Sequence, residues 1–458
     1  MTVLHTASGS RSSTATSSSP AAVSRVLPDL VGRLGNVGFA RITGSVARVR
    51  GVEVEIRGLR VKVGDPIEVH GDGTARRGEV IAVTPSGGVA ALFESAEGIG
   101  QGDRVVAAGS RARVVAGRSL LGRVVDGLGR PMDGGPPITG QLLNLTEPSP
   151  SPLQRRRVEQ PLAMGVRVLD LMCPAGRGQR LGIFGGSGVG KSTLLGMMAR
   201  GTEADVNVVA LIGERGREVR EMIEDELGPE GLARSVVVVA TSDQSAILRR
   251  RAAELAVRYA EYFADSGLDV MFLFDSLTRL AMAQRELGVA SGEPPTSRGY
   301  TPSVFSLMAA LLERTGPRAN GTITSYYTVL VDGDDMNDPV ADSARSILDG
   351  HIVLDRSLAH RGQYPAVDPL ASLSRLADRV VSPERARAAA VLRSAMAAAA
   401  EVRDLVEVGA YVAGTNPRAD AGLMVQSDIA ALLAQTPDEP GRTDEAWDLA
   451  LAIAERIS

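Results

Sequence analysis

"IFGGSGVGKSTLL", residues 183–195, is the stretch that decides the fold predicted from this sequence. Its Gly185, Gly190, Lys191 and Ser192 satisfy the spacing G-x-x-x-x-G-K-[ST], with an apolar run before and a helix-like run after. A phosphate-binding loop requires this context, because its glycines let backbone N–H groups turn inward around phosphate oxygens at the positive end of the following helix. The sequence therefore predicts a strand, a phosphate-binding loop and a helix here.

The loop also predicts particular contacts with a nucleotide. We expect Lys191 to bring a positive charge to the β and γ phosphates, and Ser192 to offer its hydroxyl to Mg²⁺. A chance glycine-rich turn is the alternative, and the flanking strand and helix argue against it. The residues expected to line the nucleotide are Gly185, Gly186, Ser187, Gly188, Val189, Gly190, Lys191, Ser192 and Thr193.

Two carboxylates follow apolar runs further along the chain. Asp275 ends "DVMFLFD", and Glu214 comes directly after "VVALIG". The carboxyl ends of strands form the ligand-binding edge of an open α/β sheet, so Asp275 is expected to support Mg²⁺ and Glu214 to polarise the attacking water. The alternatives are that Asp275 caps a helix and that Glu214 pairs with Arg215 or Arg217 on the surface.

Changes in residue composition and apolar pattern divide the chain into four parts. Residues 1–24 are a Ser- and Thr-rich tail that cannot bury enough apolar surface to fold alone. Residues 25–108 carry short alternating runs broken by glycine, which predict a small antiparallel β-barrel or sandwich. Residues 109–378 are expected to form a nucleotide-binding α/β domain, and the alanine-rich residues 379–458 a helical domain that begins near Ser382.

Five apolar runs in the α/β part predict strands of a parallel sheet that is covered by helices on both faces. They are "GQRLGIFGG", "VNVVALIGE", "SVVVVATS", "DVMFLFDS" and "GTITSYYTVLV". The stretch before them, "LGRVVDGLGRPMDGGPPITG", is dense in glycine and proline and predicts a loop-rich passage.

The composition of the 458 residues excludes several classes of function. Lys and Arg total 50 against 54 Asp and Glu, and aromatic residues make up 3%, so the chain is not expected to bind nucleic acid. The single cysteine, Cys173, excludes an intramolecular disulfide framework and is typical of a reducing cytosol. No apolar run is long enough to predict a membrane span.

Five stretches carry a family resemblance: "GRVVDGLGRPMDG", "GGSGVGKST", "GERGREV", "FLFDSLTR" and "YPAVDPLASLSR". Together they resemble the hexameric RecA-like ATPases related to the catalytic subunit of rotary ATP synthases, and Pro365–Ser374 is the family signature. The resemblance covers roughly Leu121 to Tyr411. Within the family, "GEPPTSRGYTPSVFSLMAALLERTG", "NDPVADSARSILDGHIVL" and "GAYVAGTNP" are similar to the flagellum-specific ATPases of type III export.

The resemblance implies ATP hydrolysis with Mg²⁺ and gives roles to further residues. Glu214 matches the catalytic carboxylate that orients water, and Arg215 matches a basic residue that supports it. Arg375, directly after "SLS", matches an arginine finger that reaches into a neighbour's nucleotide site. Tyr364 matches the aromatic residue that stacks on adenine, and Tyr411 is expected to close the same pocket.

One chain thus holds the phosphate loop, Glu214 and Arg375 together, so every interface in a ring of identical subunits has the groups needed for ATP hydrolysis. We expect a homohexamer assembled head to tail, in the cytoplasm at the inner-membrane export gate. The resemblance implies a regulator, a stalk protein, export chaperones, export substrates and the gate as partners. Family regulators commonly dock on the N-terminal segment; residues 1–20 show no apolar stripe, which moves the expected docking to residues 21–35.

Four alternatives stand beside this hypothesis. The first is a virulence type III secretion ATPase, which is similar to this sequence over much of the same stretches and also at "GDDMN". A catalytic subunit of a rotary synthase is disfavoured by Arg375, and a non-catalytic ring subunit by Glu214. A hexameric RNA translocase is disfavoured by the near-neutral charge and by the few aromatics before Val158.

Charged residues outside these motifs receive lesser predictions. Asp334, Asp335 and Asp338 match the family loop that faces the central pore, where a stalk protein is expected; the alternative is a solvated turn. The runs Arg155–Arg157 and Arg249–Arg251 are expected to be solvated faces or salt-bridge donors.

Overall fold

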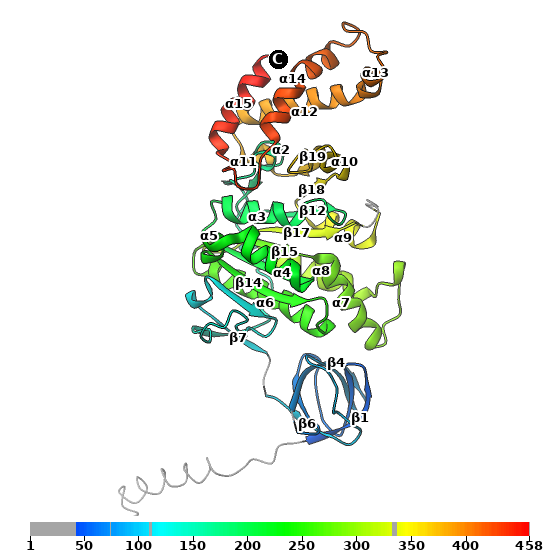
Figure 1. Ribbon diagram of the computed structural model, residues 1–458. Helices are drawn as coiled ribbons and strands as arrows, with labels where there is room; N and C mark the ends of the chain where they lie inside the picture. The colour runs from blue at the N-terminus through cyan, green and yellow to red at the C-terminus, as the bar shows by residue number, and fades with distance from the viewer. Residues whose placement is uncertain (1–42, 74, 110–111, 332–336, 458) are drawn as a thin grey trace, which may run out of the picture. The chain divides into compact units, whose positions relative to one another are not determined.

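The computed structural model describes residues 43–73, 75–109, 112–331 and 337–457 (Figure 1). Some predictions fall outside these ranges: the tail of residues 1–24, the docking segment of residues 21–35, and Asp334 with Asp335. No helix within the described ranges is long and apolar enough to cross a membrane.

Six antiparallel strands near the N-terminus close into a barrel, which confirms the predicted β-barrel. They are β1 (Thr43–Arg50), β2 (Glu53–Arg57), β3 (Pro66–His70), β4 (Ala75–Thr84), β5 (Gly87–Leu92) and β6 (Arg104–Ala107), in the order β1-β2-β5-β4-β3-β6. Alternate residues point inward, as in β2, where Val54 and Ile56 are fully buried. Closure leaves no open edge in the barrel.

A largely parallel sheet forms the centre of the next domain. Its strands are β8 (Arg123–Asp126), β12 (Arg180–Gly185), β13 (Val206–Glu214), β14 (Ser235–Thr241), β15 (Asp269–Asp275), β17 (Thr322–Leu330), β18 (Gly350–Leu354) and β19 (Val367–Ser374), with the short β16 (Gly316–Pro317) on β17. Their spatial order is β19-β18-β12-β17-β15-β13-β14-β8. The five strands predicted from apolar runs are β12, β13, β14, β15 and β17, which are confirmed as neighbours in this sheet.

Strand β8 lies inside the stretch that was predicted to be loop-rich, so that prediction is wrong for Arg123–Asp126. The run is only four residues long and is flanked by glycines, which hides it from a pattern search. It forms a strand because it pairs in parallel with β14, and this pairing buries Val125 completely. Short two-stranded ribbons flank the sheet: β7 (Arg113–Ala116) with β9 (Gln141–Asn144), and β10 (Pro161–Leu162) with β11 (Ala175–Gly176).

Helices cover both faces of the sheet, as the apolar strands predicted, and most of them are green in Figure 1. One face carries α2 (Arg167–Met172), α3 (Lys191–Gly201), α4 (Gly216–Glu221), the π-helix η3 (Met222–Leu227) and α5 (Gly228–Ala233). The other carries α6 (Ala246–Asp265), α7 (Leu277–Ala290), α8 (Pro302–Arg314) and α9 (Pro339–Ile347). Smaller helices are η1 (Arg118–Leu120), η2 (Pro152–Gln154), η4 (Ser297–Gly299) and α10 (Arg356–His360).

The C-terminal part is helical, as predicted: α11 (Ala377–Val380), α12 (Pro383–Glu401), α13 (Arg403–Glu407), α14 (Pro417–Leu433) and α15 (Thr443–Glu455). Ser382 caps α12, because its hydroxyl accepts from the N–H of Arg385 at 3.3 Å. Leu392, Val425 and Trp447 of these helices join the apolar core on the α3 side of the sheet. The helical part is therefore packed directly on the domain that carries the phosphate loop.

The three arginines of the run 249–251 form salt bridges, whereas in the first run Arg155 pairs with Glu313 at 3.5 Å and Arg156 donates to backbone carbonyls. Arg250 and Arg251 pair with the Glu79 carboxylate of the barrel, at 2.5 and 2.8 Å. Burial raises the pKa of Glu79, although the two guanidiniums oppose this shift. These contacts tie strand β4 to helix α6. In the acidic run, Asp338 caps α9 by accepting from the N–H of Val340 at 2.9 Å.

Candidate functional site

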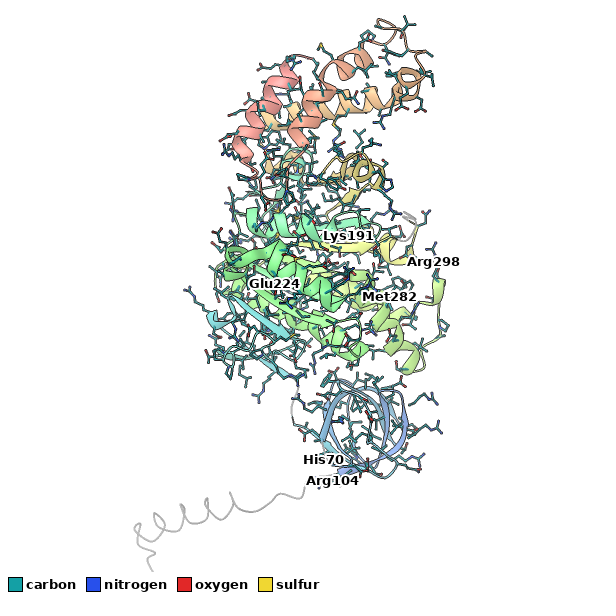
Figure 2. The ribbon with its side chains drawn as sticks, viewed as in Figure 1. His70, Arg104, Lys191, Glu224, Met282 and Arg298 are labelled. Carbon is teal, nitrogen blue, oxygen red and sulfur yellow. The ribbon has the colours of Figure 1, made fainter. Side chains whose placement is uncertain are left out.

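The predicted phosphate loop joins β12 to α3, and its backbone has the shape that such a loop needs. Gly188 and Gly190 have φ of +76° and +92°, a left-handed conformation that costs little only for glycine. The Lys191 ammonium donates to Gly185 O at 3.1 Å and to Gly186 O, so it lies inside the loop. Figure 2 labels Lys191 in the nucleotide-binding domain. Ser187 is exposed at the mouth. A glycine-rich loop that ends at a helix N-terminus fits a triphosphate.

Three predicted residues are brought to one edge of the sheet. Gly185 ends β12, Glu214 ends β13 and Asp275 ends β15, and these strands all run parallel. The strands β13 and β15 are neighbours, with Asp275 opposite Leu211, and the charge of Asp275 acts on the Glu214 carboxylate. The edge is the one at which ligands bind in open α/β sheets.

A bulge in β13 sets the direction of Glu214. The pairing of β13 with β14 shifts between Ile212 and Glu214, and Gly213 between them has a φ of +78°. A Cβ on Gly213 would lie 2.8 Å from the Cβ of Arg279 on α7, so only glycine fits. The glycine thus lets α7 come close and leaves Arg279 Nε 3.9 Å from a Glu214 carboxylate oxygen.

Burial and neighbouring charge decide the protonation of Glu214. Burial raises the pKa of Glu214 to about 8, helped by the Asp275 charge and by a hydrogen bond shared with Glu218, while Arg279 opposes the shift. For Glu218, burial is outweighed by that same hydrogen bond and by Arg215, and its pKa is lowered. Arg215 and Arg217 pair with Glu218 at 3.1 and 3.0 Å rather than with Glu214.

Asp275 is almost completely buried at the end of β15. Burial raises the pKa of Asp275, against a hydrogen bond from the Thr328 hydroxyl at 2.5 Å and the charges of Lys191 and Arg279. The alternative that Asp275 caps a helix is wrong. The next residue, Ser276, caps α7, because its hydroxyl accepts from the N–H of Arg279 at 3.3 Å. Asp275 is therefore left facing Lys191.

A cavity of about 650 Å³ opens beside the loop, over helix α3. Tyr364 lines it and is half exposed, so its ring is available for stacking. Thr193 lines it too, but its hydroxyl is already committed to Glu226 at 2.8 Å. The opposite wall comes from residues 434–439 of the C-terminal part.

Tyr411 is not part of this cavity, contrary to the sequence expectation. It lies in the turn between α13 and α14, where its hydroxyl donates to Asp420 Oδ1 at 2.9 Å. Gln435, Thr436 and Pro437 stand in the position that was expected for Tyr411. The sequence placed Tyr411 by resemblance alone, and no spacing rule connects the C-terminal turns to the loop.

Arg375 lies at the opposite edge of the sheet from the phosphate loop. Strand β19 runs antiparallel to β18, so Val367 pairs with Leu354 near the loop and Ser374 pairs with Gly350 at the far end. The N–H of Arg375 donates to Asp349 O at 3.0 Å, beside the first residue of β12. At ~3.3 Å per residue, the length of β12 separates Arg375 from its own loop by about 17 Å. Its side chain is exposed.

Known proteins are similar to this chain over most of its length. Residues 165–374 match the ATP synthase alpha/beta family, nucleotide-binding domain, and residues 381–449 match the T3SS EscN ATPase C-terminal domain. The flagellum-specific ATP synthase of Bacillus subtilis is 47% identical over 407 residues, covering 88% of this chain and 93% of the relative. The type 3 secretion system ATPase of Xanthomonas euvesicatoria is 45% identical over 425 residues, covering 92% and 96%.

The chain belongs to the family of flagellar and type III secretion ATPases. A solved structure of assembled EscN in complex with its central stalk EscO, from enteropathogenic E. coli, overlays with a TM-score of 0.83 at 39% identity, covering 90% of this chain and 100% of that one. The predictions of a RecA-like fold, of ATP hydrolysis and of a role in type III export are thereby confirmed.

Several residues of this export ATPase site were not predicted. Arg279 is in the quoted "FLFDSLTR", and its place just after the strand that ends at Asp275 was a usable sign. Glu218 follows the strand that ends at Glu214 in the same way and offered the same sign. Thr328 meets Asp275 only because β17 and β15 are neighbours, which a single sequence does not reveal.

The paired carboxylates predict the pH profile of this export ATPase. As the expected proton acceptor, Glu214 works only when ionised, so kcat/KM for ATP should rise with pH through about 8. Glu218→Gln removes the carboxylate that shares the proton, lowers the pKa of Glu214, and should move the midpoint to lower pH. Steady-state rates across the pH range measure both. Glu221→Gln, an exposed change on the same helix, is the control, and an unmoved midpoint in Glu218→Gln contradicts the pairing.

Proposed function

We propose that this chain is the ATPase of a flagellar export apparatus and that it works as a homohexamer whose active centres are each shared by two copies. We call the cavity lined by Tyr364 the base cavity, because it would take the base of ATP. One observation carries the proposal: a single segment begins at this base cavity with Tyr364 and ends with Arg375 at the other edge of the sheet. Since about a strand's length separates Arg375 from its own loop, it serves only the loop of a neighbour. The assembled state of EscN supports this reading.

Each residue at the shared centre has a part in hydrolysis. Glu214 takes a proton from water as the water oxygen bonds to the γ phosphorus and the bond to ADP breaks. Lys191 and the loop N–H groups hold the phosphates, and Arg375 of the next copy stabilises the charge of the transition state. Arg279 and Arg215 support Glu214 from either side, directly and through Glu218.

We infer that Mg²⁺ is the metal. In the described part of the chain no three His, Cys, Asp or Glu side chains are grouped to hold an ion, so a metal here must share its ligands with phosphate and water. Mg²⁺ is bound in this way, through one or two protein oxygens. Ser192, exposed beside Lys191, and Asp275 are the oxygens that fit, and bound Mg²⁺ would neutralise phosphate charge.

The partners and place in the cell follow from the same proposal. A stalk protein is expected in the ring, as EscO is with EscN, together with a regulator, chaperones, export substrates and the gate. We place the ring in the cytoplasm, at the cytoplasmic face of the inner membrane, with no nucleic acid as partner. Flagellar export is preferred to virulence secretion because of the three stretches quoted above, and the 47% and 45% identities support both.

Mixing two inactive variants tests the shared centre. Arg375→Ala keeps its own loop and Glu214, while Glu214→Gln keeps its finger and should still bind ATP. Each alone should lose turnover by about 10³-fold or more. A one-to-one mixture should regain activity, because about a quarter of its interfaces join a good loop to a good finger.

The control for this mixing is Arg375→Ala with a double variant that lacks both Glu214 and Arg375, which offers no competent interface. ATPase rate against protein concentration supplies the second measurement, since a shared centre gives a cooperative rise. Full activity of a demonstrably monomeric sample would refute the proposal.

Asp275→Asn tests the metal assignment. The change removes the charge that supports Mg²⁺, so the Mg²⁺ concentration for half-maximal turnover should rise and kcat should fall by at least about tenfold. Binding of ATP in EDTA, measured by calorimetry, should be unchanged or tighter because a negative charge is gone. An unaltered Mg²⁺ dependence contradicts the role of Asp275.

Deleting the chain in its own cell tests the flagellar role. Motility and flagellar assembly should be lost while respiration-linked ATP synthesis continues, because export and not synthesis depends on this ring. Restoring the chain should restore motility, and Glu214→Gln should fail to do so. Normal swimming with lost secretion of virulence proteins would assign the chain to the other export system.

A further inference from the structure

The wall of the base cavity that faces Tyr364 belongs to the connection between α14 and α15. Residues 434–439 form this wall, and the peptide N–H of Gln435 donates to Tyr364 O at 2.9 Å. The width of the cavity therefore depends on how firmly this connection is held. A connection of this kind has no helix or strand of its own to fix it.

One arginine of the nucleotide domain holds most of the connection. Arg167, the first residue of α2, donates through Nε to Leu432 O at 2.9 Å and through its terminal nitrogens to Ala434 O and to the Glu439 carboxylate. Its backbone N–H donates to Gln435 Oε1 at 2.8 Å. The hydrogen bond from Arg167 lowers the pKa of Glu439, so the Glu439 carboxylate is ionised at neutral pH.

Gln435 completes the attachment from the other side. It is 4% exposed, and its amide nitrogen donates to Gly165 O at 2.9 Å and to Glu439 O at 2.8 Å. Both ends of its side-chain amide are thus used inside the protein. Gln435 shapes the wall, and its hydrogen-bonding groups are not free to contact a base.

The wall is also fastened to the helix that follows the phosphate loop. Arg200 of α3 donates to Pro437 O at 2.8 Å, and beyond the wall the Thr443 hydroxyl donates to Asp170 of α2 at 2.8 Å. Gly441 packs so tightly on Gly165 that a Cβ on Gly441 would lie 2.3 Å from Gly165 O. The fastening therefore runs from α2 and α3 on one side to the α14–α15 connection on the other.

We propose that Arg167 is a positioning residue for nucleotide binding, which holds the 434–439 wall at the distance from Tyr364 that a base needs. The inference rests on the proposed function, in which this cavity takes the base of ATP. A guanidinium is required because one planar group serves Nε and both terminal nitrogens at once, and it also meets the carbonyl end of α14. Lysine carries the charge but cannot reach these acceptors together.

Calorimetric binding of two ligands tests the proposal: ATP, and inorganic tripolyphosphate, which has the phosphates without the base. Arg167→Ala should weaken ATP binding by about tenfold or more, since it removes charge-assisted hydrogen bonds that hold the wall. Tripolyphosphate binding should not change. KM for ATP should rise in parallel while kcat at saturation stays within about twofold, and Arg167→Lys should recover little of the loss.

Three further variants make the outcome decisive. Arg456→Ala breaks an exposed ion pair at 2.6 Å between the residue that follows α15 and Asp428 of α14, and should leave both ligands unaffected. Gln435→Ala should repeat the loss of ATP binding if Arg167→Ala proves too unstable to purify. Tyr364→Ala should weaken ATP binding through the base alone.

The failures are distinguishable. If Tyr364→Ala weakens ATP binding but Arg167→Ala and Gln435→Ala do not, the positioning role is wrong and the cavity stands. If none of them changes it, the base does not bind in this cavity, and the proposed site is wrong as well. Equal loss of ATP and tripolyphosphate in Arg167→Ala shows a general structural role and overturns the inference.

Discussion

The reversal of direction between β18 and β19 is the constraint on which the active centre depends. The other neighbour of β18, which is β12, runs parallel to it, so loops at one edge collect the phosphate-binding groups. The antiparallel β19 carries the chain from Tyr364 at that edge to Arg375 at the other. Because β19 is the outermost strand, Leu370 and Leu373 along it are 39% and 47% exposed. A neighbour that covers this edge also covers apolar surface.

Burial, rather than distance between the side chains, limits the negative charge at the binding edge of the sheet, because it disfavours the ionised carboxylates. Glu214, Glu218 and Asp275 would repel one another if all were ionised, and desolvation adds to the cost for Glu214 and Asp275. The positive charges of Lys191 and Arg279 offset part of this repulsion and desolvation cost, and the proton shared by Glu214 and Glu218 offsets more of it. Like charges held together by buried surroundings are typical of catalytic sites, because they move pKa values toward neutrality.

How much the sequence could predict depended on how local each feature is. The phosphate loop and five core strands were predictable because continuous apolar runs and glycine spacing are properties of short stretches. Strand β8 was missed because four residues between glycines form a strand only through pairing with β14. Arg167 and Gln435 are 268 residues apart and meet through tertiary packing, so no local pattern could connect them. Tyr411 was misplaced for the same reason.

The close approach of Gly165 to its two glycine neighbours has a mechanical consequence. Gly201 ends the helix that begins at Lys191, and a Cβ on Gly165 would lie 2.6 Å from the Cα of Gly201. Gly441 of the C-terminal part presses on the same residue. Three main chains thus touch with no side chain between them to bend or change rotamer. Any tilt of α3 is therefore transmitted to the C-terminal part as a rigid displacement, because no side chain at this contact can adjust to absorb it.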